Sequence, residues 1–188
     1  VRNYKGDSFV SSKSYRILVI GDSTARDVAN MYIEKYPEGD IELIYRSDVN
    51  HCNAPYSSDF LRLAEGSTHV VFSELANRID ENCAAELAAG PFKDKILFFG
   101  IKDFGYNISW VILESPGKRA FLTNEINEIS VIKDATDQAS AGELTYVSVL
   151  DNLRADGQIL ITDGAGCLLT ADNIHLTKCG AQFLGGLL

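Results

Sequence analysis

Three residues in two motifs near opposite ends of the sequence have the types needed for nucleophilic catalysis. Ser23 ends the motif GDS, which directly follows an apolar run, and Asp172 and His175 form the motif DNIH near the end of the chain. A serine nucleophile needs a base that takes its proton, and the base needs a group that fixes its tautomer. One local turn can supply both groups, because Asp172 and His175 are three positions apart. The spacing therefore predicts a catalytic site made of Ser23, His175 and Asp172.

The GDS motif also fits two other roles. Serine and aspartate are preferred at helix N-caps, and residues 19–32 taken alone support a cap as well as a nucleophile. A helix start can also bind phosphate through its backbone N–H groups, as in a flavodoxin-like loop. The motif lacks the glycines of a dinucleotide site and the lysine of a nucleoside triphosphate loop. The distant DNIH motif favours the catalytic interpretation.

The other two histidines are weaker candidates for the base. His69 immediately precedes an apolar run, so we expect a structural role for it. His51 lies in a polar stretch that can lie near a site, but it does not follow the last predicted strand as His175 does. His175 is therefore the predicted base.

Composition argues against several classes of function. The 188 residues are 46% hydrophobic, which is enough for the core of one domain. Acidic residues outnumber Lys and Arg by 26 to 17, for a formal charge of -9, and no basic cluster follows a phosphate backbone. No apolar run approaches the roughly 20 residues of a membrane span, and the first residues lack a signal-peptide pattern. We expect no nucleic-acid partner, no metal and no cofactor.

Five apolar runs alternate with segments of helical spacing. The runs cover 16–20, 41–45, 69–72, 95–101 and 144–150, and the helical segments cover 24–35, 57–65, 81–89, 124–137 and 177–188. Runs without polar alternation are typical of strands covered on both faces, so we predict an α/β, doubly wound sandwich with five parallel strands. Ligands bind beyond the carboxyl ends of such strands, which is where GDS lies. Residues 1–14 are polar and predict a linker or leader, and the domain spans 15–188.

The four cysteines leave the redox compartment open. None has the close CxxC spacing of a zinc or thioredoxin-type site, so two disulfides and four buried thiols are equally supported by composition. Three pairings are possible if disulfides form. Proximity in sequence favours Cys167 with Cys179 and leaves Cys52 with Cys83.

The terminal motifs carry a resemblance to a known family. The stretches VIGDS and DNIHLTKCGAQFLG resemble the SGNH hydrolase superfamily, which has its serine in an N-terminal GDS block and its Asp and His in a C-terminal DxxH block. With the CNAP stretch after the second run and GIKDFGYNISW after the fourth, the chain is similar to SGNH domains fused to membrane acyltransferases of the acyltransferase-3 family. The resemblance covers most of the chain from Arg16 onward.

This resemblance implies a fold and a function. The implied fold is a flavodoxin-like three-layer sandwich, and the implied activity is transfer or hydrolysis of an acyl group, often acetyl, on a carbohydrate. Ser23 would attack the acyl carbonyl, His175 would take its proton, and Asp172 would fix the imidazole tautomer. The implied partners are an acyl donor, a carbohydrate acceptor and an N-terminal membrane acyltransferase domain. The implied location is periplasmic or extracellular, which favours disulfides.

The oxyanion hole departs from the family pattern. The family has a glycine after the second strand, but residues 41–56 contain none. A backbone N–H from residues 48–52 is able to substitute, because any residue other than proline has one. The family's GxND block corresponds to residues 74–77, which keep only Asn77. We therefore predict an oxyanion hole made of the Ser23 N–H and Asn77, with Asn107 as the alternative. Such a weakened hole also fits a domain that binds glycan or a partner with little or no turnover.

Two aromatic residues are candidates for contact with the substrate. Tyr106 and Trp110 flank Asn107 and offer flat surfaces for a sugar ring. Ordinary packing beneath a loop is an equally supported role for both.

Overall fold

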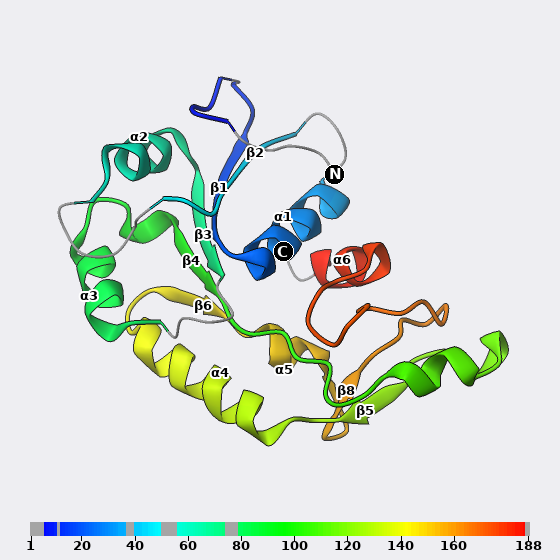
Figure 1. Ribbon diagram of the computed structural model, residues 1–188. Coiled ribbons are helices and arrows are strands. Elements are labelled where there is room, and N and C mark those ends of the chain that lie inside the picture. Colours follow the sequence, from blue (N-terminus) through cyan, green and yellow to red (C-terminus); the bar gives the residue numbers. More distant parts are fainter. Residues whose placement is uncertain (1–5, 11, 37–39, 50–55, 74–78, 187–188) are drawn as a thin grey trace.

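Five strands lie side by side and parallel, in the order β2-β1-β3-β4-β6. They are β1 (Tyr15–Gly21), β2 (Ile41–Arg46), β3 (His69–Ser73), β4 (Ile96–Phe99) and β6 (Thr145–Val147). The computed structural model describes residues 6–10, 12–36, 40–49, 56–73 and 79–186. Each predicted apolar run contributes one strand, so the predicted parallel sheet is confirmed (Figure 1).

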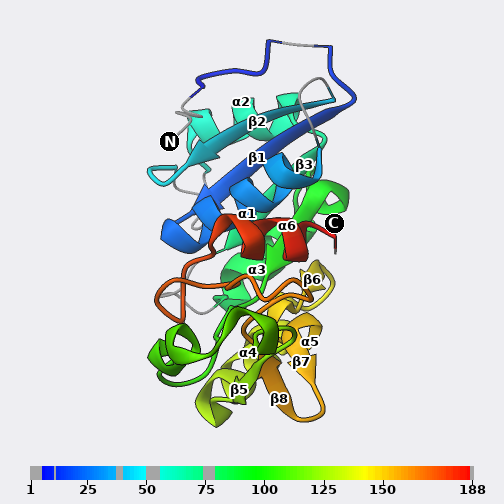
Figure 2. The ribbon, with the colours of Figure 1, turned by 90° about the vertical axis from the view of Figure 1, so that its right-hand side faces the viewer.

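Helices cover both faces of this sheet. One face carries α1 (Ser23–Lys35), α5 (Val149–Leu153) and α6 (Lys178–Gly185), and the other carries α2 (Ser58–Gly66), α3 (Glu81–Ala89) and the end of α4 (Glu128–Ala141). Figure 2 looks onto the layer formed by α1 and α6, with the sheet behind it. The three layers agree with the predicted sandwich.

Strand β1 shows why the strands of this sheet have continuous apolar sequences. Ile17 and Val19 pack into the core cluster beneath α1 and α6, whereas Leu18 and Ile20 pack into the cluster beneath α2 and α3. All four side chains are at most 1% exposed. A strand buried on both faces cannot place polar residues on either side, which removes the alternation of a half-exposed strand.

The part of the chain between β4 and α6 differs most from the prediction. It holds the 3-10 helices η2 (Ser109–Leu113) and η3 (Pro116–Lys118) and a second, antiparallel sheet. A further 3-10 helix, η1 (Lys93–Lys95), lies just before β4. The antiparallel sheet consists of β5 (Thr123–Glu125), β8 (Gln158–Leu160) and β7 (Arg154–Ala155), in that order. Strands of two or three residues are too short to produce a periodic pattern, so the sequence does not reveal them.

Two predicted boundaries are wrong. The run 144–150 is a strand only over 145–147, because Ser148 caps a new helix by accepting a hydrogen bond from the Asp151 N–H. The helix expected at 124–137 begins only at residue 128, after Asn127 caps it, and runs to 141. Ile129 and Ile132, which have helical spacing in the sequence, are about two-thirds exposed at 66% and 65%. Its buried face instead carries polar side chains.

The first residues lie against the domain where they are described. Phe9 packs against the core cluster under α2, and the Lys13 ammonium donates to the Ile41 carbonyl at 3.1 Å. The division of the chain at residue 15 stays a prediction. Within the described residues, no helix has both the length and the apolar character to cross a membrane.

Gly21 gives a first testable prediction. It adopts φ +139°, and a Cβ there would lie 2.0 Å from the Ser73 carbonyl oxygen on the neighbouring strand. Gly21→Ala is therefore expected to lower the free energy of unfolding by about 3 kcal/mol or more, through backbone strain and overpacking. Urea denaturation measures this loss. Gly117→Ala is the control, since its Cβ would meet nothing within 4 Å. Equal stability of the two variants would contradict the prediction.

Candidate active site

Ser23 is the first residue of α1 and is not its cap. The N-cap is Asp22, whose carboxylate accepts hydrogen bonds from the N–H and the hydroxyl of Thr24, each at 2.8 Å. The Ser23 hydroxyl is thereby left to face His175, whose Nε2 lies 2.9 Å from the Ser23 Oγ. Ser23 thus combines a position at the positive end of a helix with a histidine partner.

The tight turn around Ser23 is held from the neighbouring strand. The Tyr45 hydroxyl, at the end of β2, donates to the Asp22 carbonyl at 2.9 Å and lies 3.3 Å from the Gly21 carbonyl. The Thr24 hydroxyl lies 3.2 Å from the Ser73 hydroxyl at the end of β3. Sequence reasoning missed Tyr45, although its place at the end of the strand beside β1 was a usable signal.

The DNIH segment folds into a closed turn around the Asp172 carboxylate. One oxygen, Oδ1, accepts the backbone N–H groups of His175 at 2.7 Å and Ile174 at 3.1 Å. The other, Oδ2, lies 2.7 Å from the His175 Nδ1. The structure therefore brings Ser23, His175 and Asp172 from two distant motifs into one hydrogen-bonded chain.

Asn173 connects this turn to the segment after β4. It has φ +71°, a left-handed conformation that asparagine tolerates better than most residues. Its amide donates to the Tyr106 carbonyl at 2.6 Å, and its own carbonyl accepts from the Phe104 N–H at 3.2 Å. Tyr106 and Trp110, the predicted substrate contacts, are 58% and 37% exposed, so both rings are accessible to a ligand.

The structure describes some of the residues predicted to form the oxyanion hole. The Asn107 amide oxygen accepts the Ser109 N–H at 2.8 Å and so stabilises the turn that leads into η2. Asn77 lies outside the described residues, and its role stays a prediction. Of the segment 48–52, Asp48 is described and binds Arg46 at 2.7 Å, and the rest beyond residue 49 lies outside the described part.

His69 lies at the opposite end of the sheet from Ser23. It opens β3 opposite Ile17, whereas Gly21 pairs with Ser73 at the far end of the same strand. Its Nδ1 is 3.1 Å from the Thr68 hydroxyl, and burial lowers the pKa of its imidazole. These contacts agree with the expected structural role. His51 lies outside the described residues.

Hydrogen bonding keeps Asp172 ionised over an unusually wide pH range. The backbone N–H and then the imidazole of His175 lower its pKa from 3.8 to about 2. A carboxylate with a lowered pKa stabilises the fold above its ordinary pKa, and this contribution is lost as the pH falls through about 2. Asp172 is therefore an anion at neutral pH.

Carbon-13 NMR of the Asp172 carboxyl tests this pKa. We expect a midpoint of about 2 in the wild type. His175→Ala should raise it, while the two backbone N–H bonds keep it below 3.8, the ordinary value. A wild-type midpoint at that ordinary value would contradict the prediction.

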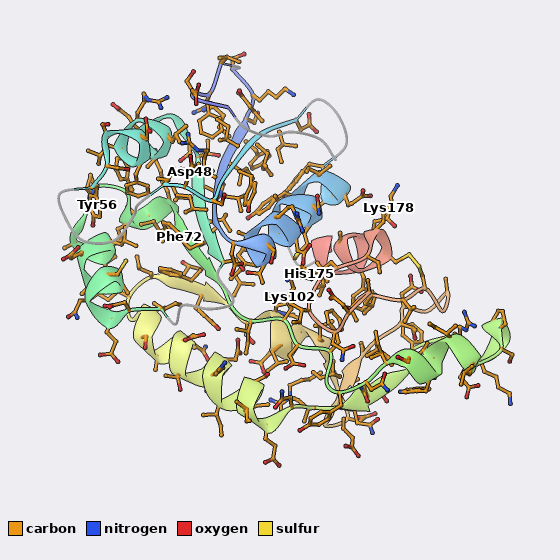
Figure 3. All side chains as sticks on the ribbon, in the orientation of Figure 1. Asp48, Tyr56, Phe72, Lys102, His175 and Lys178 are labelled. Atoms are coloured by element: carbon orange, nitrogen blue, oxygen red, sulfur yellow. A yellow bond between two sulfur atoms is a disulfide. The ribbon has the colours of Figure 1, made fainter. Side chains whose placement is uncertain are left out.

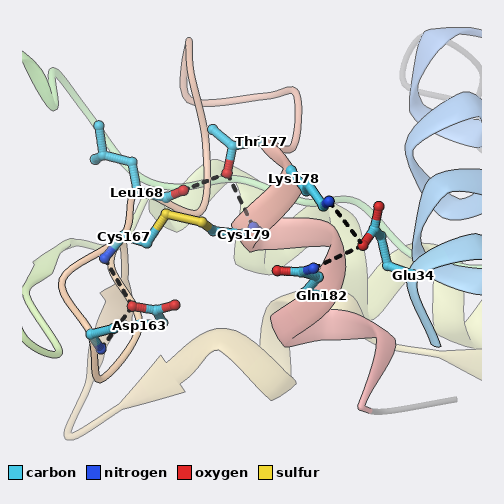
Figure 4. Close-up of a disulfide and its surroundings, with 10 residues drawn as sticks. Glu34, Asp163, Cys167, Leu168, Thr177, Lys178, Cys179 and Gln182 are labelled. Atoms are coloured by element: carbon cyan, nitrogen blue, oxygen red, sulfur yellow. Dashed lines mark hydrogen bonds and ion pairs between the residues drawn. A yellow bond between two sulfur atoms is a disulfide. The ribbon is translucent and has the colours of Figure 1, made fainter. Parts of the chain in front are cut away.

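A disulfide closes the loop that contains the DNIH turn. Cys167 and Cys179 are bonded, as their proximity predicted, and they flank both Asp172 and His175 (Figure 4). Cys83 is also disulfide-bonded, and its predicted partner Cys52 lies outside the described residues. The loop is thereby fixed at both ends.

The base of this loop is further tied to α1. Glu34 of α1 accepts a hydrogen bond from Gln182 of α6 at 2.8 Å and lies 4.0 Å from the Lys178 ammonium. The Thr177 hydroxyl accepts from the Gly180 N–H at 3.1 Å and caps α6. Helix α6 therefore starts at a defined place beside the helix that carries Ser23.

The potential metal ligands found among the described residues do not form a metal centre. Asp163, Cys167 and Cys179 bring their ligand atoms within 4.8 Å of one another. The two sulfur atoms are bonded to each other, however, so neither is a thiolate that can bind a metal. The Asp163 carboxylate instead accepts the Cys167 N–H at 2.8 Å.

Removing the Cys167–Cys179 disulfide is expected to destabilise the protein. Cross-linking a loop of this length restricts the unfolded chain, so Cys167→Ser/Cys179→Ser should lower the free energy of unfolding by about 3 kcal/mol. Denaturation without reductant measures the loss while the Cys83 disulfide stays intact. A variant as stable as the wild type would contradict this prediction.

A buried ion pair was also missed by sequence reasoning. Lys102 and Asp27 lie 2.8 Å apart behind the DNIH turn, and Figure 3 places Lys102 close to His175. Two signals were present in the sequence. Lys102 directly follows the apolar run 95–101, and Asp27 is one helical turn beyond Ser23 on a helix whose buried face is otherwise largely apolar.

Comparison with known proteins shows what the fold is similar to. No protein-family model and no curated protein matches the chain. Among solved structures, the periplasmic domain of the lipopolysaccharide acetyltransferase of Salmonella ser. Paratyphi A is similar, with a TM-score of 0.61 and 17% sequence identity. The match covers 94% of this chain and 83% of that one. At this identity the similarity shows a shared fold, an α/β sandwich with a five-stranded parallel sheet.

Proposed function

We propose that this chain is an SGNH-type domain that transfers an acyl group, acetyl in particular, to a carbohydrate or hydrolyses it from one. The observation that carries the proposal is the continuous hydrogen-bonded chain from Ser23 through His175 to Asp172. The acetyl group and the carbohydrate are supported by the description of the similar Salmonella domain as part of a lipopolysaccharide acetyltransferase.

The proposed reaction has two steps and uses no cofactor or metal. In the first, His175 Nε2 takes the Ser23 proton while Oγ attacks the acyl carbonyl, and the donor's leaving group departs with a proton from His175. In the second, His175 removes a proton from a sugar hydroxyl or water, whose oxygen attacks the acyl-serine. The bond to Ser23 Oγ breaks, His175 returns the proton to that oxygen, and the new ester or acid is released. The anion of Asp172 stabilises the imidazolium in both steps.

The groups that stabilise the developing oxyanion differ from the family pattern. The Ser23 N–H lies at the positive end of α1, where it favours negative charge. Asn77 is the proposed second donor, with Asn107 as the alternative. Each donor in such a hole contributes about 3 kcal/mol to transition-state stabilisation, so loss of the family glycine predicts a slow esterase.

The proposed setting is extracytoplasmic. The Cys167–Cys179 disulfide agrees with an oxidising compartment, and the similar Salmonella domain is described as periplasmic. We propose an N-terminal membrane acyltransferase domain as the partner that supplies the acyl group, and Tyr106 and Trp110 as surfaces for the sugar.

A fluorophosphonate probe tests the proposed function directly. Such probes react with a serine only when a neighbouring base activates it. We expect one probe per folded molecule, bound at Ser23, and none after denaturation. A folded protein that binds glycan but takes up no probe would instead support the alternative function, a binding domain with little or no turnover.

A further inference from the structure

The Lys102–Asp27 ion pair is almost completely removed from water. The two side chains are 1% and 4% exposed, and their charged atoms are 2.8 Å apart. Burial lowers the pKa of Lys102, and the neighbouring Asp27 carboxylate acts in the opposite direction. A buried ion pair adds little to stability compared with an apolar pair of similar size, because both charges lose their hydration. Another role is therefore needed to explain this pair.

Both members of the pair bind the backbone on either side of His175. The Lys102 ammonium donates to the Ile174 carbonyl at 3.1 Å. The Asp27 carboxylate accepts the Leu176 N–H at 3.0 Å. The peptide groups before and after the base are thus each held by a charged side chain.

The remaining polar groups of this short segment also have partners. The His175 carbonyl accepts from the Thr170 hydroxyl at 2.7 Å and from the Ala171 N–H at 3.2 Å. The His175 and Ile174 N–H groups bind Asp172. Asn173 also binds the segment after β4, and the imidazole of His175 binds Ser23. Among the described residues, the ion pair is what joins the Ile174 carbonyl and the Leu176 N–H to elements outside this loop.

The ion pair also relates the base to the nucleophile. Asp27 lies four residues after Ser23 on α1, so the two side chains leave the same face of the helix, one turn apart. The hydrogen bond from the Leu176 N–H to Asp27 therefore fixes the position of the DNIH turn along the axis of α1, the helix that carries Ser23. Lys102 connects the same point to the carboxyl end of β4.

We propose that Lys102 and Asp27 are positioning residues that aim the His175 Nε2 at the Ser23 hydroxyl by fixing the backbone on both sides of the base. The proposal rests on the proposed function for its kinetic consequence, but the geometry of His175 can be measured without it. Neither residue touches the reacting atoms. Misplacing a catalytic group by about 1 Å costs on the order of 10²-fold in rate, so loss of these contacts has a large expected effect.

Two double variants separate positioning from simple loss of charge. Lys102→Met/Asp27→Leu removes both backbone contacts without leaving a buried charge unpaired. Lys102→Met/Asp27→Asn also removes both charges but keeps an amide oxygen that can accept the Leu176 N–H. The matched control is Asp134→Asn, which alters an equally buried carboxylate that binds Tyr146 and Ser148 at 2.6 Å each.

The kinetic measurement is the rate of fluorophosphonate labelling at increasing probe concentration. It gives two quantities, the maximal rate constant and the probe concentration at half of that maximum. We expect a loss of about 10²-fold in Lys102→Met/Asp27→Leu and about 10-fold in Lys102→Met/Asp27→Asn, with the half-saturating concentration unchanged. Asp134→Asn should react like the wild type. If the leucine variant does not fold, the asparagine variant carries the test alone.

Proton NMR of the His175 Nδ1–H provides the second measurement. Its low-field resonance reports the hydrogen bond to Asp172 and does not require any reaction. We expect it in the wild type and in Asp134→Asn, and its loss or broadening in the leucine variant. If the wild type takes up no probe, the proposed function fails and this resonance still decides the positioning role. The positioning role of Lys102 and Asp27 would be overturned by a folded leucine variant that keeps the wild-type resonance. It would also be overturned by folded double variants that are labelled at the wild-type rate.

Discussion

Ser23→Ala is expected to lower the rate of p-nitrophenyl acetate hydrolysis by at least about 10⁴-fold. Alanine removes the oxygen that lies 2.9 Å from the His175 Nε2, so no acyl-serine can form. His175→Ala should cost about as much, because the hydroxyl then has no base. The double variant should be no slower than either single variant, since residues that act as one unit have non-additive effects.

Ser58→Ala is the matched control for the loss of a serine at a helix start. Ser58 is the first residue of α2, as Ser23 is of α1, and the cap before it is Ser57. It is exposed and should be dispensable for the reaction. Equal rates in Ser23→Ala and Ser58→Ala would contradict the role of Ser23. All variants should unfold at nearly the wild-type urea concentration.

Asp172→Asn is expected to lower kcat by about 10⁴-fold while the turn stays folded. The amide oxygen can still accept the N–H groups of Ile174 and His175. The NH₂ group then replaces the Oδ2 atom that lies 2.7 Å from the His175 Nδ1. Because NH₂ is a donor, it favours the tautomer with the proton on Nε2, which cannot accept the proton of Ser23.

Nitrogen-15 NMR of His175 identifies the tautomer and accompanies the kinetics. We expect the neutral imidazole to carry its proton on Nδ1 in the wild type and on Nε2 in Asp172→Asn. Asp163→Asn is the control, because the Asp163 carboxylate also closes a turn by accepting the N–H groups of Ala165 and Cys167. An Asp172→Asn variant with the wild-type tautomer and a near-normal kcat would show that Asp172 does not orient the base.

Strong local patterns account for what the sequence predicts well. A strand such as β1, buried on both faces, must be apolar throughout, so its pattern depends little on the rest of the fold. The DNIH turn is also local, because its carboxylate binds backbone groups two and three residues further on. Ser23 could be proposed because GDS follows such a strand at the edge where ligands bind.

Features that depend on distant neighbours escaped prediction. Lys102 and Asp27 are far apart in the sequence, and neither has a local motif that indicates the other. The exposed Ile129 and Ile132 have helical spacing, which identifies the helix but misleads about its buried face. Asp134 is buried there instead, because Tyr146 and Ser148 supply its hydrogen bonds from another element. Such tertiary partners override the hydropathy of single residues.

Trapping the acyl-enzyme tests the central claim most directly. The wild type is mixed with p-nitrophenyl acetate, quenched in acid during the first turnover, digested with trypsin and analysed by mass spectrometry. We predict one acetyl group on Ser23, with strongly reduced occupancy in His175→Ala and in Asp172→Asn and full occupancy in Ser58→Ala. A wild-type protein that hydrolyses the ester with no acetyl on Ser23, or with the acetyl on another residue, would contradict the proposed mechanism.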